Sequence, residues 1–246
     1  MSLSFPSCIS PPPCEGRGTR FFWLFPILLS CLALAPRDAR GRTSPNIKVA
    51  PLTQEGALAN CGPTAAAMVI AHALGKEDAT ALRDLIGRWS WARFPMRAFR
   101  LPGGEPGMTT PSMMHEILSV FGVQARVTSI KHPFLPGDMF ALMHLRALLE
   151  SGRPVVLMVE SPVLWGTRQA GLHWIVVRGV EGENFLFNDP ADGSVQRVST
   201  ERLWRAWRLH PLWRRLPGIE GFTGFVLEDA PFYEGGARRV AGLGAR

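Results

Sequence analysis

Apolar positions along the chain follow two kinds of spacing, and each kind predicts a different element. Four segments with helix-forming residues and recurring apolar positions predict helices near residues 62–74, 78–88, 111–121 and 139–150. Four further segments have strand character and predict strands near residues 123–130, 154–160, 173–180 and 184–189. Gly122 and Gly152 each stand between a predicted helix and a predicted strand, where they act as helix stops.

The order of these elements predicts an α+β fold with an N-terminal helical half and a C-terminal sheet half. The cleft between two such halves is a natural place for a substrate. Along the chain we expect three regions: an export or targeting segment with disordered flanks over residues 1–42, a folded domain over residues 43–232 and a disordered tail over residues 233–246.

The N-terminal region has the features of an export signal. Arg17 and Arg20 precede an apolar run over residues 21–35, which is shorter than the roughly 20 residues that span a bilayer and suits the core of a signal peptide. Two processing points are open: the small-residue pattern Ala33-Leu34-Ala35, and a lipoprotein-type sequence ending at Cys31. An uncleaved membrane anchor is the alternative. We expect an exported protein of the periplasm or cell envelope, attached to the membrane if the segment is an anchor or a lipoprotein signal.

Composition narrows the class of protein. Hydrophobic residues make up 46% of the 246 residues and charged residues 19%, which is typical of a globular protein and not of a disordered one. The net charge of +7 could favour anionic lipid, cell-envelope polymer or nucleic acid. However, the arginines are spread along the whole chain, without the dense basic block or interleaved aromatic-basic motif of a nucleic-acid module. We therefore expect no nucleic-acid partner.

The position of one cysteine indicates chemistry. The other three cysteines lie in or before the targeting segment, so after its removal Cys61 is the only thiol of the folded domain, which excludes an internal disulfide and a multi-cysteine metal site. Gly-Pro-Thr and an alanine-rich apolar run up to Gly75 follow it and predict a buried helix. At a helix N-terminus, backbone N–H groups and the helix dipole favour thiolate over thiol. We interpret Cys61 as a nucleophile; the alternative is a buried inert thiol.

A thiolate nucleophile needs a base, and among the six histidines His173 has the most suitable surroundings. It begins the strand-like HWIVVRGV, EGEN follows as a turn, and FLFNDP returns as a second strand ending at Asp189. In a hairpin, His173 and Asp189 would meet at the same open end. A carboxylate beside an imidazole fixes its tautomer and stabilises the imidazolium. A simple Asp-Pro turn is the alternative for Asp189, and the other five histidines fit packing, surface or loop positions better.

Together these motifs carry a resemblance to a known family. NCGPTAAAMVI, GMTTPSMMHEILSVFG, LLESGRPVVLMVE and HWIVVRGV…FLFNDP resemble the papain-like cysteine peptidases of the bacteriocin-processing (double-glycine leader peptidase) type, and are most similar to their stand-alone relatives. The resemblance covers about residues 46–230. It implies a papain-like fold, with Cys61 as nucleophile, His173 as general base and then acid, and Asp189 as the residue that orients His173.

The resemblance also implies that Gln54 and the backbone N–H of Cys61 donate hydrogen bonds to an oxyanion. An amide N–H aimed at the developing negative oxygen is worth roughly 2.7–4 kcal/mol in the transition state. Gln54 precedes Cys61 by seven positions, one more than is usual in papain-like enzymes. A glutamine of a surface loop is the alternative interpretation.

Two further segments have two interpretations each. The Trp-, Arg-, Pro- and Gly-rich residues 88–107 could form a wall or lid of the cleft, or an irregular surface loop. Residues 199–218 carry tryptophans among arginines; we expect a helix that packs its tryptophans on the sheet, as related enzymes have, rather than a membrane-surface helix.

Three functional hypotheses result. The first is a cysteine peptidase-like hydrolase that cleaves a peptide or isopeptide bond through an acyl-enzyme. The second is a papain-like acyltransferase that uses the same thiol. The third is a non-catalytic peptide-binding module, which would be expected to lack a member of the triad, whereas Cys61, His173 and Asp189 are all present. We expect a monomer with a peptide or protein substrate and no metal or cofactor.

Overall fold

The computed structural model describes residues 46–54, 61–95, 107–127, 137–166 and 171–228, all within a compact unit over Arg40–Arg246. A six-stranded sheet in the order β1-β6-β2-β3-β4-β5 runs through these residues, and every neighbouring pair is antiparallel. The strands are β1 (Ala125–Val127), β2 (Val155–Glu160), β3 (Leu172–Glu181), β4 (Asn184–Asp189), β5 (Ser194–Ser199) and β6 (Gly224–Leu227).

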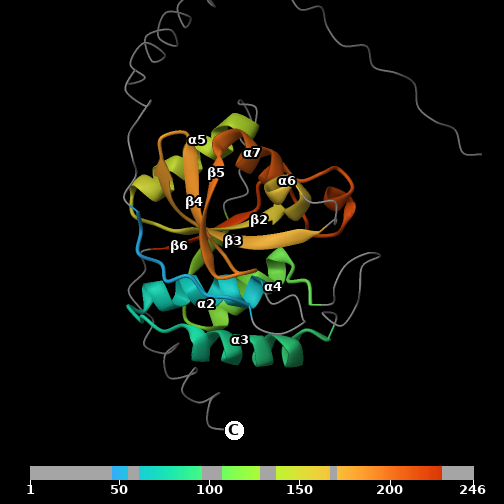
Figure 1. Ribbon diagram of the computed structural model, residues 1–246. Coiled ribbons are helices and arrows are strands. Elements are labelled where there is room, and N and C mark those ends of the chain that lie inside the picture. The colour runs from blue at the N-terminus through green and yellow to red at the C-terminus, as the bar shows by residue number, and fades with distance from the viewer. Residues whose placement is uncertain (1–45, 55–60, 96–106, 128–136, 167–170, 229–246) are drawn as a thin grey trace, which may run out of the picture. The chain divides into compact units, whose positions relative to one another are not determined.

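Helices cover both faces of this sheet. On one side lie α2 (Cys61–Ala73), α3 (Thr80–Arg93) and α4 (Pro111–Val120), and on the other α5 (Gly137–Glu150), α6 (Ser161–Trp165) and α7 (Thr200–Arg208) (Figure 1). A short 3-10 helix, η3 (Trp213–Arg215), follows α7. Because helices shield both faces, the central strand β2 is buried over Val155–Val159 and its sequence is continuously apolar instead of alternating.

Helix α2 lies between the sheet and the outer helix α3 (Figure 1). It is buried over Cys61–Ala71, which explains why its sequence is apolar almost all round. Its alanines add little bulk, which suits a helix packed on several sides. The first residue of this enclosed helix is Cys61, so the thiol is buried at the N-terminal end of the helix.

The β3–β4 hairpin sets the register between the two strands that carry His173 and Asp189. Glu181 pairs with Asn184 across a tight turn in which Gly182 has a φ of 60°, a conformation that glycine adopts without strain. A β-bulge lies between Val177 and Gly179. The guanidinium of the bulge residue Arg178 donates to Asn188 Oδ1 and to the carbonyl of Val49, which ties the N-terminal described segment to the hairpin.

The described elements confirm the predicted α+β class and most of the predicted segments. Two predicted elements differ in length, and two observed elements have no predicted counterpart. Helix α3 continues to Arg93, beyond the predicted end at residue 88, because Trp89 packs edge-on against Phe94 and Phe121. Strand β1 is only three residues long, and residues 128–130 lie outside the described part of the chain. Helix α6 and strand β5 were not predicted.

The helix α7 ends at Arg208, and its tryptophans have different environments. Trp207 is buried and donates its Nε1–H to the carbonyl of Thr223 at 2.8 Å. Trp204 is half-buried beneath the guanidinium of Arg208. The packing of Trp207 agrees with the predicted interior helix. Of residues 88–107, the first six belong to α3, and residues 96–106, with most of the proposed wall or lid, lie outside the described residues.

Candidate active site

Cys61 is the first residue of α2 and is buried, with 7% of its surface exposed. It is the only free cysteine among the described residues. Its sulfur accepts backbone hydrogen bonds from Gly62 on the same helix and from Trp174 on strand β3. The thiol therefore lies at the junction of the helical half and the sheet half, as the helix-start pattern predicts.

The environment of Cys61 favours the thiolate. Burial alone would raise the pKa of the thiol, but the positive charge of His173, the hydrogen bond from the His173 ring and the two backbone N–H groups together outweigh it and lower the pKa below its ordinary value. A cysteine with a lowered pKa has a larger population of the nucleophilic thiolate at neutral pH. Position and electrostatics thus point to the same chemistry.

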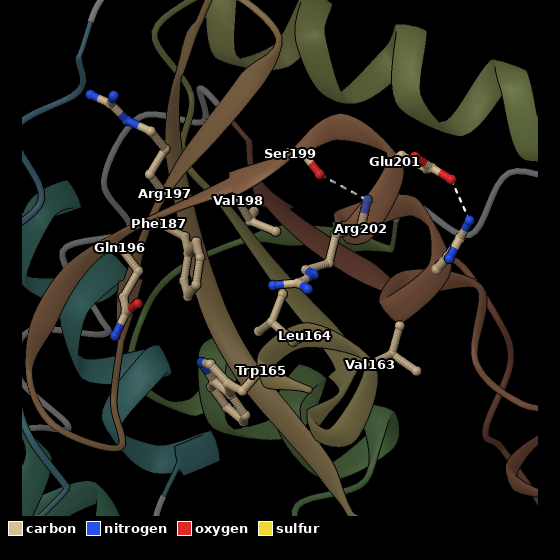
Figure 2. A pocket seen from close by; sticks show the side chains of 11 residues that line it. Val163, Leu164, Trp165, Phe187, Gln196, Arg197, Val198, Ser199, Glu201 and Arg202 are labelled. Atoms are coloured by element: carbon tan, nitrogen blue, oxygen red, sulfur yellow. Dashed lines mark hydrogen bonds and ion pairs between the residues drawn. The ribbon is translucent and has the colours of Figure 1, made fainter. Parts of the chain in front are cut away.

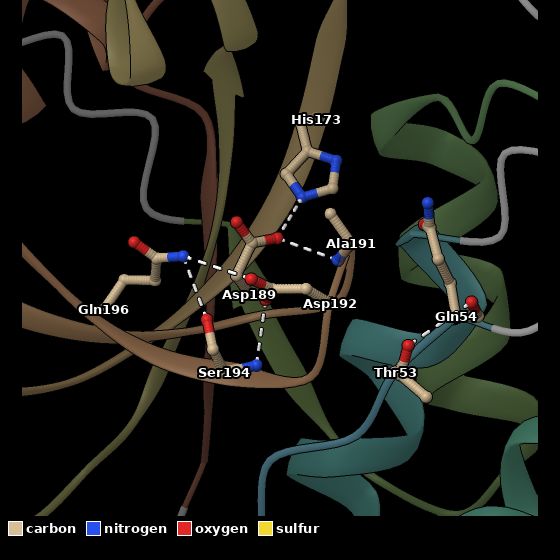
Figure 3. A network of polar contacts seen from close by, with 8 residues as sticks. All are labelled: Thr53, Gln54, His173, Asp189, Ala191, Asp192, Ser194 and Gln196. Atoms are coloured by element: carbon tan, nitrogen blue, oxygen red, sulfur yellow. Dashed lines mark hydrogen bonds and ion pairs between the residues drawn. The ribbon is translucent and has the colours of Figure 1, made fainter.

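His173 and Asp189 meet at the open end of the β3–β4 hairpin. His173 Nε2 lies 2.9 Å from Asp189 Oδ1, and both side chains are buried. The same carboxylate oxygen accepts the backbone N–H of Ala191 at 2.8 Å (Figure 3). With Nε2 directed to Asp189, the other ring nitrogen is the one available to the sulfur of Cys61, which also hydrogen-bonds this ring.

The charges around His173 stabilise the imidazolium. Burial lowers the pKa of His173, but the thiolate charge of Cys61, the hydrogen bond to Asp189 and the charge of Asp189 outweigh it and raise the pKa to about 9. A lowered thiol pKa and a raised imidazole pKa describe one coupled event, the transfer of a proton from sulfur to nitrogen. The arrangement is suited to nucleophilic catalysis, with the imidazole placed to return the proton.

Trp165, the last residue of α6, covers the imidazole. The ring centroids of Trp165 and His173 are 4.9 Å apart and the planes are inclined at 65°. This edge-on contact places an apolar ring beside the imidazole, and a lower local dielectric there would strengthen its charge interaction with Asp189. Sequence reasoning did not find Trp165. The sequence shows only a tryptophan in the apolar segment SPVLW after β2, and no pattern in the sequence connects this tryptophan to His173.

Gln54 lies beside the end of strand β4. Its backbone N–H donates at 2.6 Å to the carbonyl of Pro190, the residue that follows Asp189. The preceding carbonyl, that of Thr53, accepts from the buried guanidinium of Arg83 on α3 at 2.8 Å. Gln54 Oε1 is buried and has no hydrogen-bond partner among the described residues. Residues 55–60, which connect Gln54 to Cys61, lie outside the described residues.

A close contact beside Cys61 explains the glycine that follows it. A Cβ atom at Gly62 would lie 2.3 Å from Thr109 Oγ1, so only glycine fits there. The carbonyl of Thr109 accepts the indole N–H of Trp174 at 2.8 Å, and the backbone N–H of Trp174 binds the sulfur of Cys61. Thr109 thus contacts both residues whose N–H groups hold the thiolate. No local sequence pattern pointed to Thr109.

The other described histidines lie away from this site or make different contacts. His72 Nδ1 lies 3.0 Å from the carbonyl oxygen of Lys48, while His115 and His210 are exposed and His144 is half-buried and stacks on Phe140. His132 lies outside the described residues. In the described part of the chain, no group of three or more His, Cys, Asp or Glu residues could hold a metal ion.

The fold and site define a papain-like α+β protein with a cysteine at the start of its central helix. Residues 46–210 match the model of the Peptidase_C39 like family. The chain belongs to this family, whose peptidase character supports a cysteine peptidase-like function. Among curated proteins, none has a sequence that matches this chain.

Two solved structures are similar to this chain. A C39-like protein from Bacillus anthracis is 15% identical, with a TM-score of 0.51 over 77% of this chain and 98% of its own. The peptidase domain of Streptococcus ComA, a bifunctional ABC transporter involved in a quorum-sensing pathway, is 20% identical, with a TM-score of 0.43 over 74% of this chain and 99% of its own. The family model and the Bacillus anthracis structure confirm the predicted resemblance to papain-like C39 peptidases at the level of family and fold.

Proposed function

We propose that the protein is a hydrolase that cleaves a peptide or isopeptide bond through a thioester acyl-enzyme formed on Cys61. The observation that carries this proposal is the buried chain of contacts from the Cys61 sulfur through the His173 ring to Asp189. A structural cysteine needs neither a charged imidazole nor a carboxylate bound to that imidazole, whereas a thiol nucleophile uses both.

In the proposed reaction, the Cys61 thiolate attacks the carbonyl carbon and forms a sulfur–carbon bond. The carbonyl oxygen becomes an oxyanion, to which Gln54 and the backbone N–H of Cys61 donate. Collapse of this intermediate breaks the carbon–nitrogen bond, and the leaving nitrogen takes a proton from the His173 imidazolium. Water then attacks the thioester carbon and gives up a proton to His173. The sulfur–carbon bond breaks, and Cys61 leaves as the thiolate. Asp189 holds the imidazole in the required orientation throughout.

The first test is the pH dependence of Cys61 alkylation by iodoacetamide in the full-length protein. Because the chain has other cysteines, the modification is read by mass spectrometry of the peptide that contains Cys61. We expect a midpoint well below the free-thiol value of about 8.5, and a higher midpoint in His173→Ala. The exposed His115 provides the matched control, and His115→Ala should keep the low midpoint. A wild-type midpoint near the free-thiol value, indifferent to His173, would contradict the proposal.

Product analysis separates hydrolysis from acyl transfer. Peptide pools incubated with the protein are compared with and without glycine amide, and products are identified by mass. Hydrolysis yields free carboxylates in both reactions, whereas an acyltransferase yields amide-bonded products when glycine amide is present. Cleavage in the wild type that is absent in Cys61→Ala supports the peptidase; binding without either product would support a non-catalytic peptide-binding module.

Localisation is a separate proposal. The basic residues and apolar run at the N-terminus support export to the cell envelope, with membrane attachment if Cys31 becomes lipidated. The structure does not describe this segment, and no helix among the described residues is long and apolar enough to cross a membrane. The test is the mass and N-terminal sequence of the protein recovered from envelope and soluble fractions of the producing cells.

A further inference from the structure

A pocket lies beside the candidate active site, between α6, β5 and the start of α7 (Figure 2). It encloses about 710 Å³. Its apolar lining includes the buried side chains of Leu164, Phe187 and Val198 and the partly exposed ring of Trp165. The pocket therefore offers a hydrophobic wall that reaches the side chain covering His173.

The polar lining of this pocket is mainly cationic. Arg197, Arg202 and Arg205 line it together with one carboxylate, that of Glu201. Two of the guanidinium groups have acidic partners, because Arg197 pairs with Glu181 and Arg205 pairs with Glu201. Arg202 differs: within the described part of the chain, no hydrogen bond or ion pair engages its guanidinium, and only its backbone N–H is used, donating to Ser199 Oγ.

The direction of Arg202 is also distinctive. Its guanidinium extends into the space near Leu164 and Trp165, whereas that of Arg197 points away from them (Figure 2). Arg202 lies in the first turn of α7, where the partial positive charge of the helix N-terminus adds to its own. A planar guanidinium of this kind binds a carboxylate through two parallel hydrogen bonds. An anionic group attached to an apolar one is the complementary ligand.

The reaction chemistry determines which part of a substrate would reach this pocket, and this step rests on the proposed function. When the carbon–nitrogen bond breaks, the leaving nitrogen takes its proton from His173 and must therefore lie beside that ring. Trp165 packs against the same ring and also lines the pocket. The residues that follow the cleaved bond would thus pass Trp165 toward Arg202.

We propose that this pocket binds a carboxylate-bearing residue of the peptide substrate on the C-terminal side of the cleaved bond. Arg202 binds the carboxylate, and Trp165 and Phe187 contact the neighbouring apolar atoms. The carboxylate belongs either to an aspartate or glutamate side chain or to the C-terminus of the substrate. The pocket then makes the enzyme selective for the leaving fragment.

Peptide binding to full-length Cys61→Ala, measured by calorimetry at low ionic strength, tests this assignment without requiring cleavage. Three pentapeptides serve as probes. The first two have capped ends and carry, between leucine and phenylalanine, a central aspartate or an asparagine in its place. The third has neutral side chains and a free C-terminal carboxylate. We expect at least one carboxylate peptide to bind about tenfold or more tightly than the asparagine peptide, as for a hydrogen bond to a charged group. The carboxylate peptide that shows the preference identifies the source.

Arg202→Gln should abolish this preference, because glutamine keeps polarity but not charge. Arg215 on η3 is exposed and lies outside the pocket, so Arg215→Gln makes the same charge change as a control and should retain the preference. Equal binding of the carboxylate and amide peptides, no binding of any of them at millimolar concentration, or a preference that survives Arg202→Gln would each overturn the proposal. Since Cys61→Ala has no nucleophile, these outcomes are independent of the alkylation test and the product analysis, which decide the catalytic role.

Discussion

The Nε2 atom of His173 lies 2.9 Å from Oδ1 of Asp189, inside the protein, across the open end of one hairpin. That oxygen also accepts the N–H of Ala191, so the carboxylate is fixed by the backbone that follows it and the imidazole is fixed by the carboxylate. The hairpin thereby holds the proposed base, His173, close to Cys61 at the start of α2.

Asp189→Asn removes the negative charge and leaves the side-chain shape. The asparagine Oδ1 can still accept from His173, but a hydrogen bond to a charged group is worth about 1.5–3 kcal/mol and a neutral one about 0.5–1.5 kcal/mol. The imidazolium therefore becomes less stable, and Cys61 alkylation at neutral pH should slow by about 10-fold. Asp192 provides the control, because it is an exposed aspartate of the same turn that binds Ser194 and Gln196 instead. An alkylation rate in Asp189→Asn equal to that in Asp192→Asn would show that Asp189 does not act on the pair.

The two pKa shifts predict a pH window for the thiolate–imidazolium pair. The pair forms as pH rises through the lowered pKa of Cys61 and disappears as pH rises through the pKa of His173, about 9. Peptide hydrolysis should therefore have a broad plateau around neutral pH with a descending limb near pH 9. The measurement is kcat/KM against pH, and a descending limb near the ordinary histidine value of 6.5 would contradict the raised pKa.

The free energy of unfolding should depend on pH through the same two groups, His173 and Cys61. Because folding raises the pKa of His173 from 6.5 to about 9, its contribution to the free energy of unfolding is complete below pH 6.5 and is lost as pH rises through 9. The lowered pKa of Cys61 acts oppositely, since its contribution is lost as pH falls through the folded value. Denaturant unfolding of the wild type and His173→Gln across this range measures the difference, with the exposed His115→Gln as reference. A difference that stays constant with pH would argue against the linkage.

Trp165→Ala tests whether the indole shields the His173–Asp189 pair. Burial lowers the pKa of His173, and its charge interactions with Cys61 and Asp189 raise it by more. Water admitted at this position would weaken both effects, so the net upward shift in the pKa should shrink. We expect the descending limb of the pH profile to move below pH 9, and Trp165→Phe to restore most of the shift. Trp204, which lies under Arg208 on α7, supplies the control variant Trp204→Ala. An unchanged limb in Trp165→Ala would remove the shielding role.

Local patterns predicted the elements that carry the proposed triad, because each depends on residues close in sequence. A cysteine before Gly-Pro and an alanine run marks a helix start, and two apolar strands around EGEN mark a hairpin. The roles proposed for Cys61, His173 and Asp189 follow from these positions, and the role proposed for Gln54 comes from the resemblance. Asp189 was placed near His173 without knowledge of the bulge at Arg178, which changes the register but not the end at which the two residues meet.

Long-range contacts account for what the sequence did not predict. Thr109 touches Gly62 across 47 positions in the chain, and Trp165 reaches His173 from a helix of five residues that follows β2 directly. Strand β5 has a mostly polar sequence in which only Val198 is buried, so its alternation gave little signal. These contacts and this strand depend on packing between different elements, so the spacing of residues within one element does not predict them.

Gly62→Ala tests the close contact that supports the thiolate. The added Cβ would lie 2.3 Å from Thr109 Oγ1 and 2.4 Å from its Cβ, so α2 or the Thr109 segment must move. We expect a loss of about 1–3 kcal/mol in the free energy of unfolding, typical of overpacking, measured by denaturant titration. Because Thr109 also holds Trp174, the midpoint of Cys61 alkylation should rise as well. Thr109→Gly removes every Thr109 atom in the contact, so in the double variant the effect of Gly62→Ala should largely vanish; strictly additive losses would show that the contact is not the cause.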